Sequence, residues 1–268
     1  MDDNREKTIR DAVRERYGEI ARHKQEKPES APCCCGEVID PFDLIKPRNQ
    51  SALMGYSEDE IASVPEGAVM GLGCGNPQAI AALRSGEVVL DLGSGAGFDS
   101  FLAARQVGEK GLVIGVDMTP EMVEIARANA LQGDFQNVQF RLGEIEDLPV
   151  EDESIDVILS NCVINLAPDK KAVYREAYRV LRKGGRVAIS DMVASGKIPP
   201  EIREDLDLHS ACVAGALEVA ELESILKEAG FEQIRINPKD ESGQFIKKWT
   251  PGIPIEDFVL SATIEAVK

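Results

Sequence analysis

The sequence has few aromatic residues, no excess of positive charge and no long apolar run. Aromatic residues make up 5% of its 268 positions, and 47 acidic against 30 basic side chains give a formal charge of −17. That charge repels nucleic acid and anionic membrane surfaces. No apolar run approaches the roughly 20 residues of a membrane span, and the first residues lack the apolar core of a signal peptide. We therefore expect a cytoplasmic protein that binds neither nucleic acid nor membranes.

Cysteine pairs of the Cys-x-x-Cys type are also missing, which disfavours a zinc ribbon or knuckle. The six cysteines are Cys33, Cys34, Cys35, Cys74, Cys162 and Cys212. In a reducing compartment isolated cysteines are most often small buried hydrophobic residues, and this alternative applies to each of them. The adjacent triplet is harder to explain in this way. The two histidines, His23 and His209, are interpreted as solvated or structural rather than catalytic.

The order of apolar segments predicts an α/β protein with a parallel sheet, because strands alternate with helices along the chain. A polar helix with one apolar stripe is expected over residues 1 to about 30, followed by an irregular loop through Pro47 that holds the cysteine triplet. Two segments near the end, 200–208 and 219–229, are predicted helices, the second capped by Gly230. The predicted strands are 87–92, 112–117, 137–142, 155–160, 186–192, 233–236 and 258–266.

One further helix is predicted over Lys170 to Lys183, ending at Gly184 and Gly185, where a left-handed cap is easy. The segment between the last two strands contains Trp249. It is long enough to form an excursion over the substrate side. We expect an N-terminal helix and cysteine-bearing loop (1–66), a ligand-binding core (67–193) and a C-terminal region with the last strands (194–268).

The most informative segment, residues 88–98, joins a buried apolar strand to a turn containing Gly93, Gly95 and Gly97. Glycines remove side chains where the backbone turns and a ligand approaches. A dinucleotide fingerprint needs glycine or alanine at the position that Phe98 occupies. The turn instead resembles the first motif of class I methyltransferases that use S-adenosylmethionine. The alternative is an ordinary strand-to-helix turn.

The second strand supports a nucleoside site, because it ends in Asp117 about twenty residues beyond the glycine turn, where ribose hydroxyls need an acceptor. Thr119 follows as the predicted N-cap of a helix, with Pro120 at its first position. Carboxylates at strand ends also serve ordinary turn chemistry. Here the strand, the carboxylate and the helix start coincide, which favours the ribose role.

Three single cysteines lie among small residues, in segments 71–77, 160–166 and 210–215. Cys162 directly follows the fourth strand, at the carboxyl edge where open α/β sheets place their ligands. With the glycine turn, these segments closely resemble the arsenite methyltransferases, and the match spans most of the chain. The resemblance implies a Rossmann-like class I methyltransferase with a mostly parallel seven-stranded sheet, helices on both faces, an N-terminal helical arm and a C-terminal substrate-side region.

The resemblance also implies roles in binding S-adenosylmethionine. The glycine turn would lie against the methionine part, Asp117 on the ribose and residues 143–145 around the adenine, while Asp91 would orient the turn. For Glu144 the alternative is a solvated loop carboxylate. The complete set implied is Asp91, Gly93, Ser94, Gly95, Gly97, Asp117, Met118, Gly143, Glu144, Ile145 and Asn161.

The implied acceptor is trivalent arsenic, a soft centre that thiolates bind well and whose lone pair is the nucleophile. The resemblance assigns Cys162 and Cys212 to hold it, so that transfer needs proximity rather than a general base. Cys74 would complete this site or form a transient disulfide with Cys33, Cys34 or Cys35, which thioredoxin or glutathione would reduce. The expected enzyme is a monomer that methylates arsenite or its thiol conjugates in arsenic detoxification.

Two other functions are compatible with the sequence. The core alone would equally suit a carbon or oxygen methyltransferase acting on a quinone or sterol, although the cysteines argue against it. A non-catalytic metalloid or redox sensor would use the cysteine loops to bind a soft ion without transferring a methyl group. An assay of methyl transfer from labelled S-adenosylmethionine to arsenite distinguishes these two functions from arsenite methylation.

Overall fold

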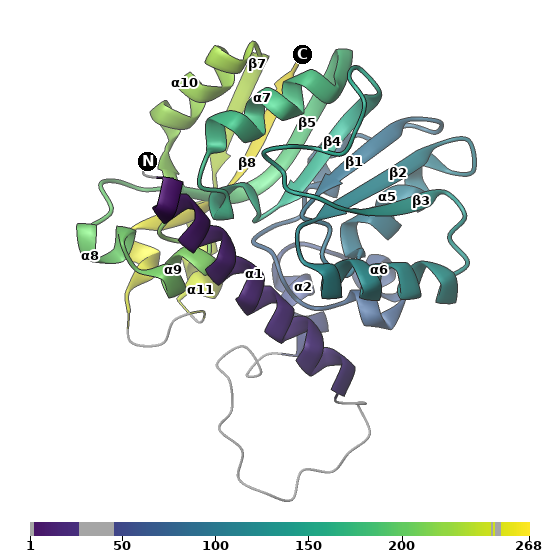
Figure 1. Ribbon diagram of the computed structural model, residues 1–268, viewed down its shortest axis with the longest axis horizontal. Helices are drawn as coiled ribbons and strands as arrows, with labels where there is room; N and C mark the ends of the chain where they lie inside the picture. Colours follow the sequence, from purple (N-terminus) through teal and green to yellow (C-terminus); the bar gives the residue numbers. More distant parts are fainter. Residues whose placement is uncertain (1–2, 27–45, 248, 250–252) are drawn as a thin grey trace, which may run out of the picture.

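A single mixed sheet forms the centre of the computed structural model, which describes residues 3–26, 46–247, 249 and 253–268 (Figure 1). Its strands lie in the order β3-β2-β1-β4-β5-β8-β7. Neighbours from β3 to β5 are parallel, whereas β8 is antiparallel to both β5 and β7. The bounds are β1 (Val88–Leu92), β2 (Leu112–Asp117), β3 (Val138–Leu142), β4 (Ile155–Asn161), β5 (Leu181–Ala194), β7 (Glu232–Pro238) and β8 (Val259–Val267). The prediction of a mostly parallel sheet is confirmed, and the two-residue strand β6 (Leu217–Glu218), paired with β5, is an addition.

Helices cover both faces of this sheet, as predicted. Leu90 and Leu92 pack in one cluster with residues of α7 (Lys170–Val180) and α10 (Val219–Ala229). Val89 lies in another cluster with α5 (Phe98–Val107). Successive strand residues point to opposite faces, so an uninterrupted apolar run such as 88–90 is buried on both. Another helix of the core, α6 (Pro120–Gln132), packs beside β2 and β3.

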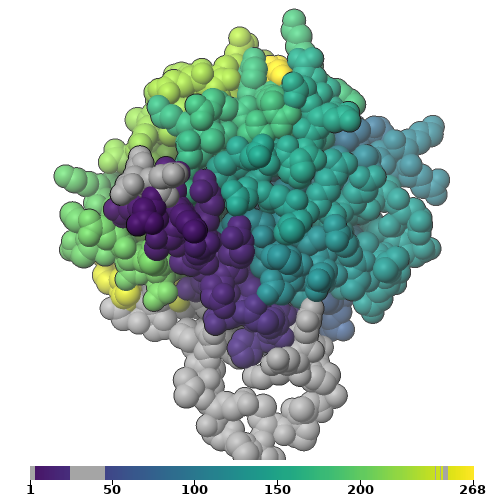
Figure 2. Space-filling model, viewed as in Figure 1, coloured from purple at the N-terminus to yellow at the C-terminus, as the bar shows by residue number. Residues whose placement is uncertain are grey.

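The N-terminal helix α1 (Asp3–Glu26) crosses the molecule below the sheet in the view of Figure 1. Figure 2 shows it in the surface between the C-terminal residues, in green and yellow, and the teal core. Its predicted apolar stripe is packed inward, with Ile9 and Val13 buried. Arg10 and Arg14 form ion pairs with Glu144 at 3.4 and 3.1 Å. The helix therefore joins the core to the C-terminal region.

Shorter helices lie between α1 and β1 along the chain, in a stretch for which no helix was predicted from the sequence. They are α2 (Pro47–Leu53), α3 (Glu58–Ala62) and α4 (Gln78–Ala81). Ser57 caps α3 in a capping box with Glu60, a pattern that is visible in the sequence. The predicted loop with the cysteine triplet falls mostly on residues 27–45, which lie outside the described residues.

Two predicted helices have different bounds in the structure. The helix from Lys170 ends at Val180, not at Lys183, because Leu181 is extended and pairs with Ile155 as the first residue of β5. Gly184 does adopt a left-handed φ of +80°, but inside that strand. The helix predicted over 200–208 is two helices, α8 (Pro200–Arg203) and α9 (Leu206–Ser210), because Asp205 caps a new helix. The capping side chain thus overrides the continuous periodicity.

The segment before β8 also contains short helical turns where sequence analysis gave an irregular excursion. They are the 3-10 turns η4 (Asp240–Ser242) and η5 (Ile255–Asp257), with α11 (Gly243–Ile246) between them. None of the helices in the described part of the chain combines the length and the apolar character needed to cross a bilayer.

Candidate active site

The glycine turn follows β1, and Gly93 and Gly95 line a large cavity. Gly93, Gly95 and Gly97 have φ values of 63°, 50° and 96°, a region that side chains disfavour. A Cβ on Gly93 would lie 2.3 Å from Val163, and one on Gly97 would lie 2.7 Å from Phe101. A Cβ on Gly95 would meet no atom within 4 Å. Close packing therefore demands two of these glycines, and the third leaves bare backbone open to the cavity.

Asp117, at the end of β2, is tied to this turn. Its Oδ2 accepts a hydrogen bond from the Gly95 N–H at 2.9 Å, and its Oδ1 accepts one from the Thr119 N–H at 2.8 Å. Burial raises the pKa of Asp117, while these backbone bonds lower it. Thr119 and Pro120 begin α6 as predicted, although the Thr119 side chain makes no capping hydrogen bond. The carboxylate is therefore fixed beside the bare Gly95 backbone.

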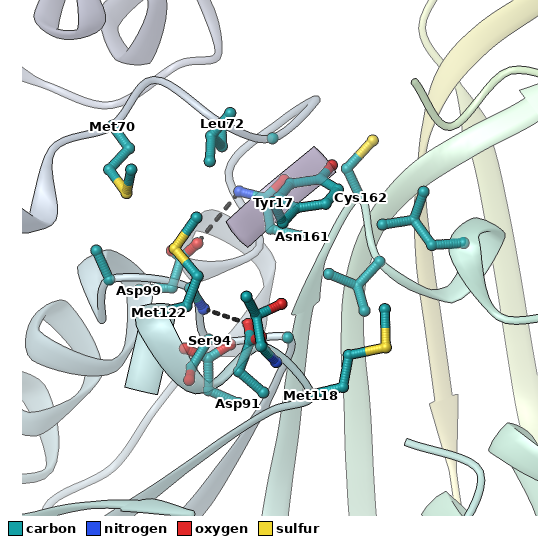
Figure 3. A pocket seen from close by; sticks show the side chains of 18 of the residues that line it. Tyr17, Met70, Leu72, Asp91, Ser94, Asp99, Met118, Met122, Asn161 and Cys162 are labelled. Carbon is teal, nitrogen blue, oxygen red and sulfur yellow. Dashed lines mark hydrogen bonds between the residues drawn. The ribbon is translucent and has the colours of Figure 1, made fainter. Parts of the chain in front are cut away.

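Most of the residues proposed for the cofactor lie around this one cavity, which measures about 1120 Å³ including its open mouth (Figure 3). Gly97, Gly143 and Glu144 do not line it: Gly143 packs against Pro149, and the Glu144 carboxylate is directed to the α1 arginines. The proposed residues that do line it are Asp91, Gly93, Ser94, Gly95, Asp117, Met118, Ile145 and Asn161.

The charges around the cavity favour a cationic ligand. Four carboxylates line it, those of Asp91, Asp99, Asp117 and Glu146, against one lining cation, Arg10. Burial, followed by repulsion from Asp99, raises the pKa of Asp91 well above its usual range. A ligand bearing phosphate would add negative charge to this group, whereas a sulfonium would compensate it. Three methionines, Met70, Met118 and Met122, add an apolar and polarisable wall.

A buried polar network that sequence analysis missed lies at one end of this cavity. The Asp99 carboxylate accepts hydrogen bonds from the Tyr56 hydroxyl at 2.7 Å and from Asn161 Nδ2 at 3.1 Å. Gln78 Nε2 donates to the Asp99 carbonyl at 2.8 Å. The only local signal was an acidic residue in the first helical turn after Gly97, and nothing in the sequence placed Tyr56 beside it.

The three single cysteines lie close together, as free thiols buried in the protein interior. The sulfurs of Cys74 and Cys162 and a carboxylate oxygen of Asp191 all lie within 4.8 Å of one another. Cys212 Sγ donates to the Cys162 carbonyl at 2.9 Å. Burial raises the pKa of Cys74 to about 11 and that of Cys162 well above its usual range. Cys74 and Cys162 are therefore neutral thiols in the site without substrate. The triplet Cys33, Cys34 and Cys35 lies outside the described residues.

Two of these cysteines have strained backbones. Cys162 and Cys212 have φ values of 59° and 62°, a left-handed conformation that costs a side-chain-bearing residue about 1–2 kcal/mol. Each is held by long-range structure: the Cys162 N–H donates to the Ser190 carbonyl, and His209, three residues before Cys212, hydrogen-bonds the Leu166 carbonyl at 3.1 Å through Nε2. His209 is thus structural, as interpreted from the sequence, and it links the two cysteine loops.

A second cavity adjoins the thiols. It is lined by Cys162, Cys212 and Trp249, among others. Five residues line both cavities and therefore form their common wall: Tyr17, Gly71, Leu72, Gly73 and Cys162. Figure 3 shows the Tyr17, Asn161 and Cys162 side chains gathered at one end of the larger cavity. Cys162 thus lies at the boundary between a pocket suited to a cationic nucleoside and the smaller pocket, which Cys212 also lines, while Cys74 is buried beside Cys162 and lines neither cavity.

Comparisons with known proteins agree with this geometry. The family model described as a methyltransferase domain matches residues 83–230. Arsenite methyltransferase of Halobacterium salinarum is 52% identical over 97% of this chain and 66% of its own length. The human arsenite methyltransferase is 45% identical over 53% of this chain and 40% of its own length. The chain therefore spans about two thirds or less of the curated relatives it matches.

Solved structures give the same result. An arsenic(III) S-adenosylmethionine methyltransferase from Chlamydomonas reinhardtii superposes with a TM-score of 0.62 at 35% identity, covering 82% of this chain and 73% of that one. A phosphoethanolamine N-methyltransferase from Haemonchus contortus, at 18% identity and a TM-score of 0.61, shares the fold. By its fold, its methyltransferase domain and its identity to the algal enzyme, the chain belongs to the arsenic(III) S-adenosylmethionine methyltransferase family.

Proposed function

We propose that this chain transfers a methyl group from S-adenosylmethionine to trivalent arsenic bound by cysteine thiols. The observation that carries the proposal is a cluster of three buried free thiols, of which Cys162 lines the cavity that the glycine turn and Asp117 define. The named relatives, which methylate arsenite or arsenic(III), support the same reaction. Its outcome would be methylated arsenicals, as in arsenic detoxification.

The residues of the larger cavity fit S-adenosylmethionine. The bare backbone at Gly93 and Gly95 would hold the methionine part, Asp117 would accept from the ribose, and Ile145 would contact the adenine. Ser94 Oγ is buried without a partner among the described residues and offers a further polar contact. When bound, the cofactor supplies a methyl group made electrophilic by its sulfonium, and the four lining carboxylates favour that positive charge.

The acceptor site is proposed to consist of Cys74, Cys162 and Cys212. Arsenous acid reacting with three thiols forms three As–S bonds and releases three water molecules, so the reaction balances without a change in net charge. The thiols hold arsenic next to the larger cavity, which would contain the methyl donor, and leave the arsenic lone pair free to accept the methyl group. The protein's contribution is then proximity and orientation, and no residue has to act as a general base.

The reduction of arsenic after methyl transfer is proposed from the sequence resemblance alone. Methyl transfer to the lone pair raises arsenic from the trivalent to the pentavalent state, and two electrons restore it. Cys74 and one of the triplet cysteines would supply these electrons by forming a disulfide, which thioredoxin or glutathione would reduce. The monomeric state, the cytoplasmic location and a role for Glu144 beside the adenine also stay predictions.

The test is methyl transfer from labelled S-adenosylmethionine to arsenite in the presence of thiol. The wild-type chain should yield labelled methylarsenicals, and Cys162→Ser or Cys212→Ser should abolish them, because a hydroxyl does not replace a soft sulfur ligand. Arsenite turnover that survives both substitutions contradicts the thiol mechanism. Tight arsenite binding with no loss of label from the cofactor would instead indicate a sensor.

A further inference from the structure

The segment Gly73 to Gly75 is held between two strands that lie far away in the sequence. The Cys74 N–H donates to Asn161 Oδ1 at 3.0 Å, at the end of β4. The Cys74 carbonyl accepts from Ser261 Oγ at 2.7 Å, on β8. Both hydrogen bonds are long-range, and Ser261 is fully buried. The backbone on both sides of the Cys74 side chain is therefore fixed.

The two glycines around Cys74 permit this close approach. A Cβ on Gly73 would lie 2.8 Å from Asn161 Oδ1, and one on Gly75 would lie 2.9 Å from Ser190 Oγ. Real Cβ contacts are longer, so a side chain at either position would push the segment away from its hydrogen-bond partners. The alternation of glycine, cysteine and glycine is thus a packing requirement of the Cys74 backbone.

Asn161 is itself fully engaged. Three acceptors share the two hydrogens of its Nδ2: the Gly75 carbonyl at 2.9 Å, the Tyr56 hydroxyl and the Asp99 carboxylate. Asn161 also directly precedes Cys162. The end of β4 therefore carries one thiol and holds the backbone of another, which accounts for the closeness of the Cys74 and Cys162 sulfurs.

We propose that Asn161 and Ser261 are positioning residues that preorganise Cys74 as the third arsenic ligand. This inference rests on the proposed function and adds to it which residues make the site a three-thiol site. With the Cys74 backbone fixed, arsenite does not have to immobilise a mobile loop to gain its third As–S bond. Without that anchoring, Cys162 and Cys212 would remain as a two-thiol site.

The test uses Ser261→Ala with Ser190→Ala as its matched control. Both serines are fully buried beside the Cys74 segment, but Ser190 Oγ has no hydrogen-bond partner among the described residues, so its removal breaks no such bond. Ser261 does not line the larger cavity, where the cofactor is proposed to bind, whereas Asn161 does. Ser261 is therefore the residue substituted in the test. Gly75→Ala is a second variant, which displaces the same segment without removing a polar group.

Two trivalent arsenicals distinguish positioning from general damage: arsenite, which takes three thiols, and phenylarsine oxide, which takes two. Ser261→Ala should weaken arsenite binding at least roughly 10-fold, since it removes the buried hydrogen bond to the Cys74 carbonyl, and Gly75→Ala should weaken it too by displacing the same segment. X-ray absorption should show the number of sulfurs around arsenic fall from three to two. Phenylarsine oxide affinity should stay within about 2-fold, as should both affinities of Ser190→Ala.

Wild-type affinity for arsenite with three sulfur ligands in both variants would overturn the inference. Equal loss of both arsenicals would overturn it too, since Cys74 would then not be the ligand affected. A wild-type protein that binds arsenic through three sulfurs but transfers no methyl group would refute the proposed function and leave the positioning intact.

Discussion

His209 should make the protein less stable in mild acid. The side chain is buried, and its Nε2 lies 3.1 Å from the Leu166 carbonyl, which only accepts, so this nitrogen carries a hydrogen in the folded state. Burial lowers the pKa of His209 from 6.5 to about 4. Between these two values the unfolded chain binds a proton that the folded chain does not. The free energy of unfolding therefore falls as the pH is lowered through this window.

The size of the effect follows from the difference in pKa. Each unit corresponds to about 1.4 kcal/mol, so the full loss by pH 4 is about 3 kcal/mol and the loss at pH 5 is about 2 kcal/mol. Buried aspartates such as Asp191, whose pKa burial raises to about 6, act in the opposite direction over the same range. The wild-type curve alone is therefore a sum of opposing effects, and a variant is needed to isolate His209.

His209→Gln isolates it, because the Gln amide can still donate to the Leu166 carbonyl but does not titrate. Urea unfolding of both proteins at pH 7.5 and pH 5 should show that the variant loses about 2 kcal/mol less than the wild type. His23→Gln is the control, since His23 is exposed on α1 and should leave the loss unchanged. Equal losses in wild type and His209→Gln would refute this reasoning.

Two further substitutions test the site. Cys212→Gly should be more stable than Cys212→Ala by about 1 kcal/mol, because glycine tolerates the left-handed φ of 62° better than alanine does. Both variants should lose methylation of arsenite. Equal free energies of unfolding for the two variants would show that the conformation is not strained. Tyr17→Ala should merge the two cavities and lower the rate of methyl transfer at least about 10-fold, because the substrate loses its orientation. Tyr17→Phe keeps the ring between the cavities, so its rate should stay near that of the wild type. A single-turnover assay with labelled cofactor measures both rates, and an equal loss in Tyr17→Phe would assign the role to the hydroxyl instead of the ring.

The donor side of the site was largely predictable because it depends on local pattern. A buried strand followed by glycines, and a second strand ending in Asp117, specify parallel strands whose carboxyl ends meet at one edge. Glu144 shows the limit of this reasoning. Its segment lies at the expected edge, but α1 supplies Arg10 and Arg14 to its carboxylate. A partner 130 residues away, such as Arg14, cannot be read from the pattern around Glu144.

The ends of helices were less predictable, since tertiary pairing competes with periodicity there. Leu181 continues the apolar stripe of α7, and periodicity alone extends the helix through it. In the structure it pairs with Ile155 and starts β5, because the sheet offers a backbone partner that the sequence around Leu181 does not reveal.

The acceptor side depends on an interruption of alternation that sequence patterns do not report. Along a regular strand, neighbouring side chains point to opposite faces. The Cys162 thiol would then point away from the Cys74 segment, which the Asn161 side chain binds. The left-handed φ of Cys162 ends that alternation immediately after Asn161. The thiol of Cys162 thus lies within 4.8 Å of the thiol of Cys74, whose backbone the Asn161 amide binds. The strain at Cys162 is the local cost of bringing both sulfurs to one side of the strand end, and the hydrogen bond from its N–H to the Ser190 carbonyl helps to hold it there.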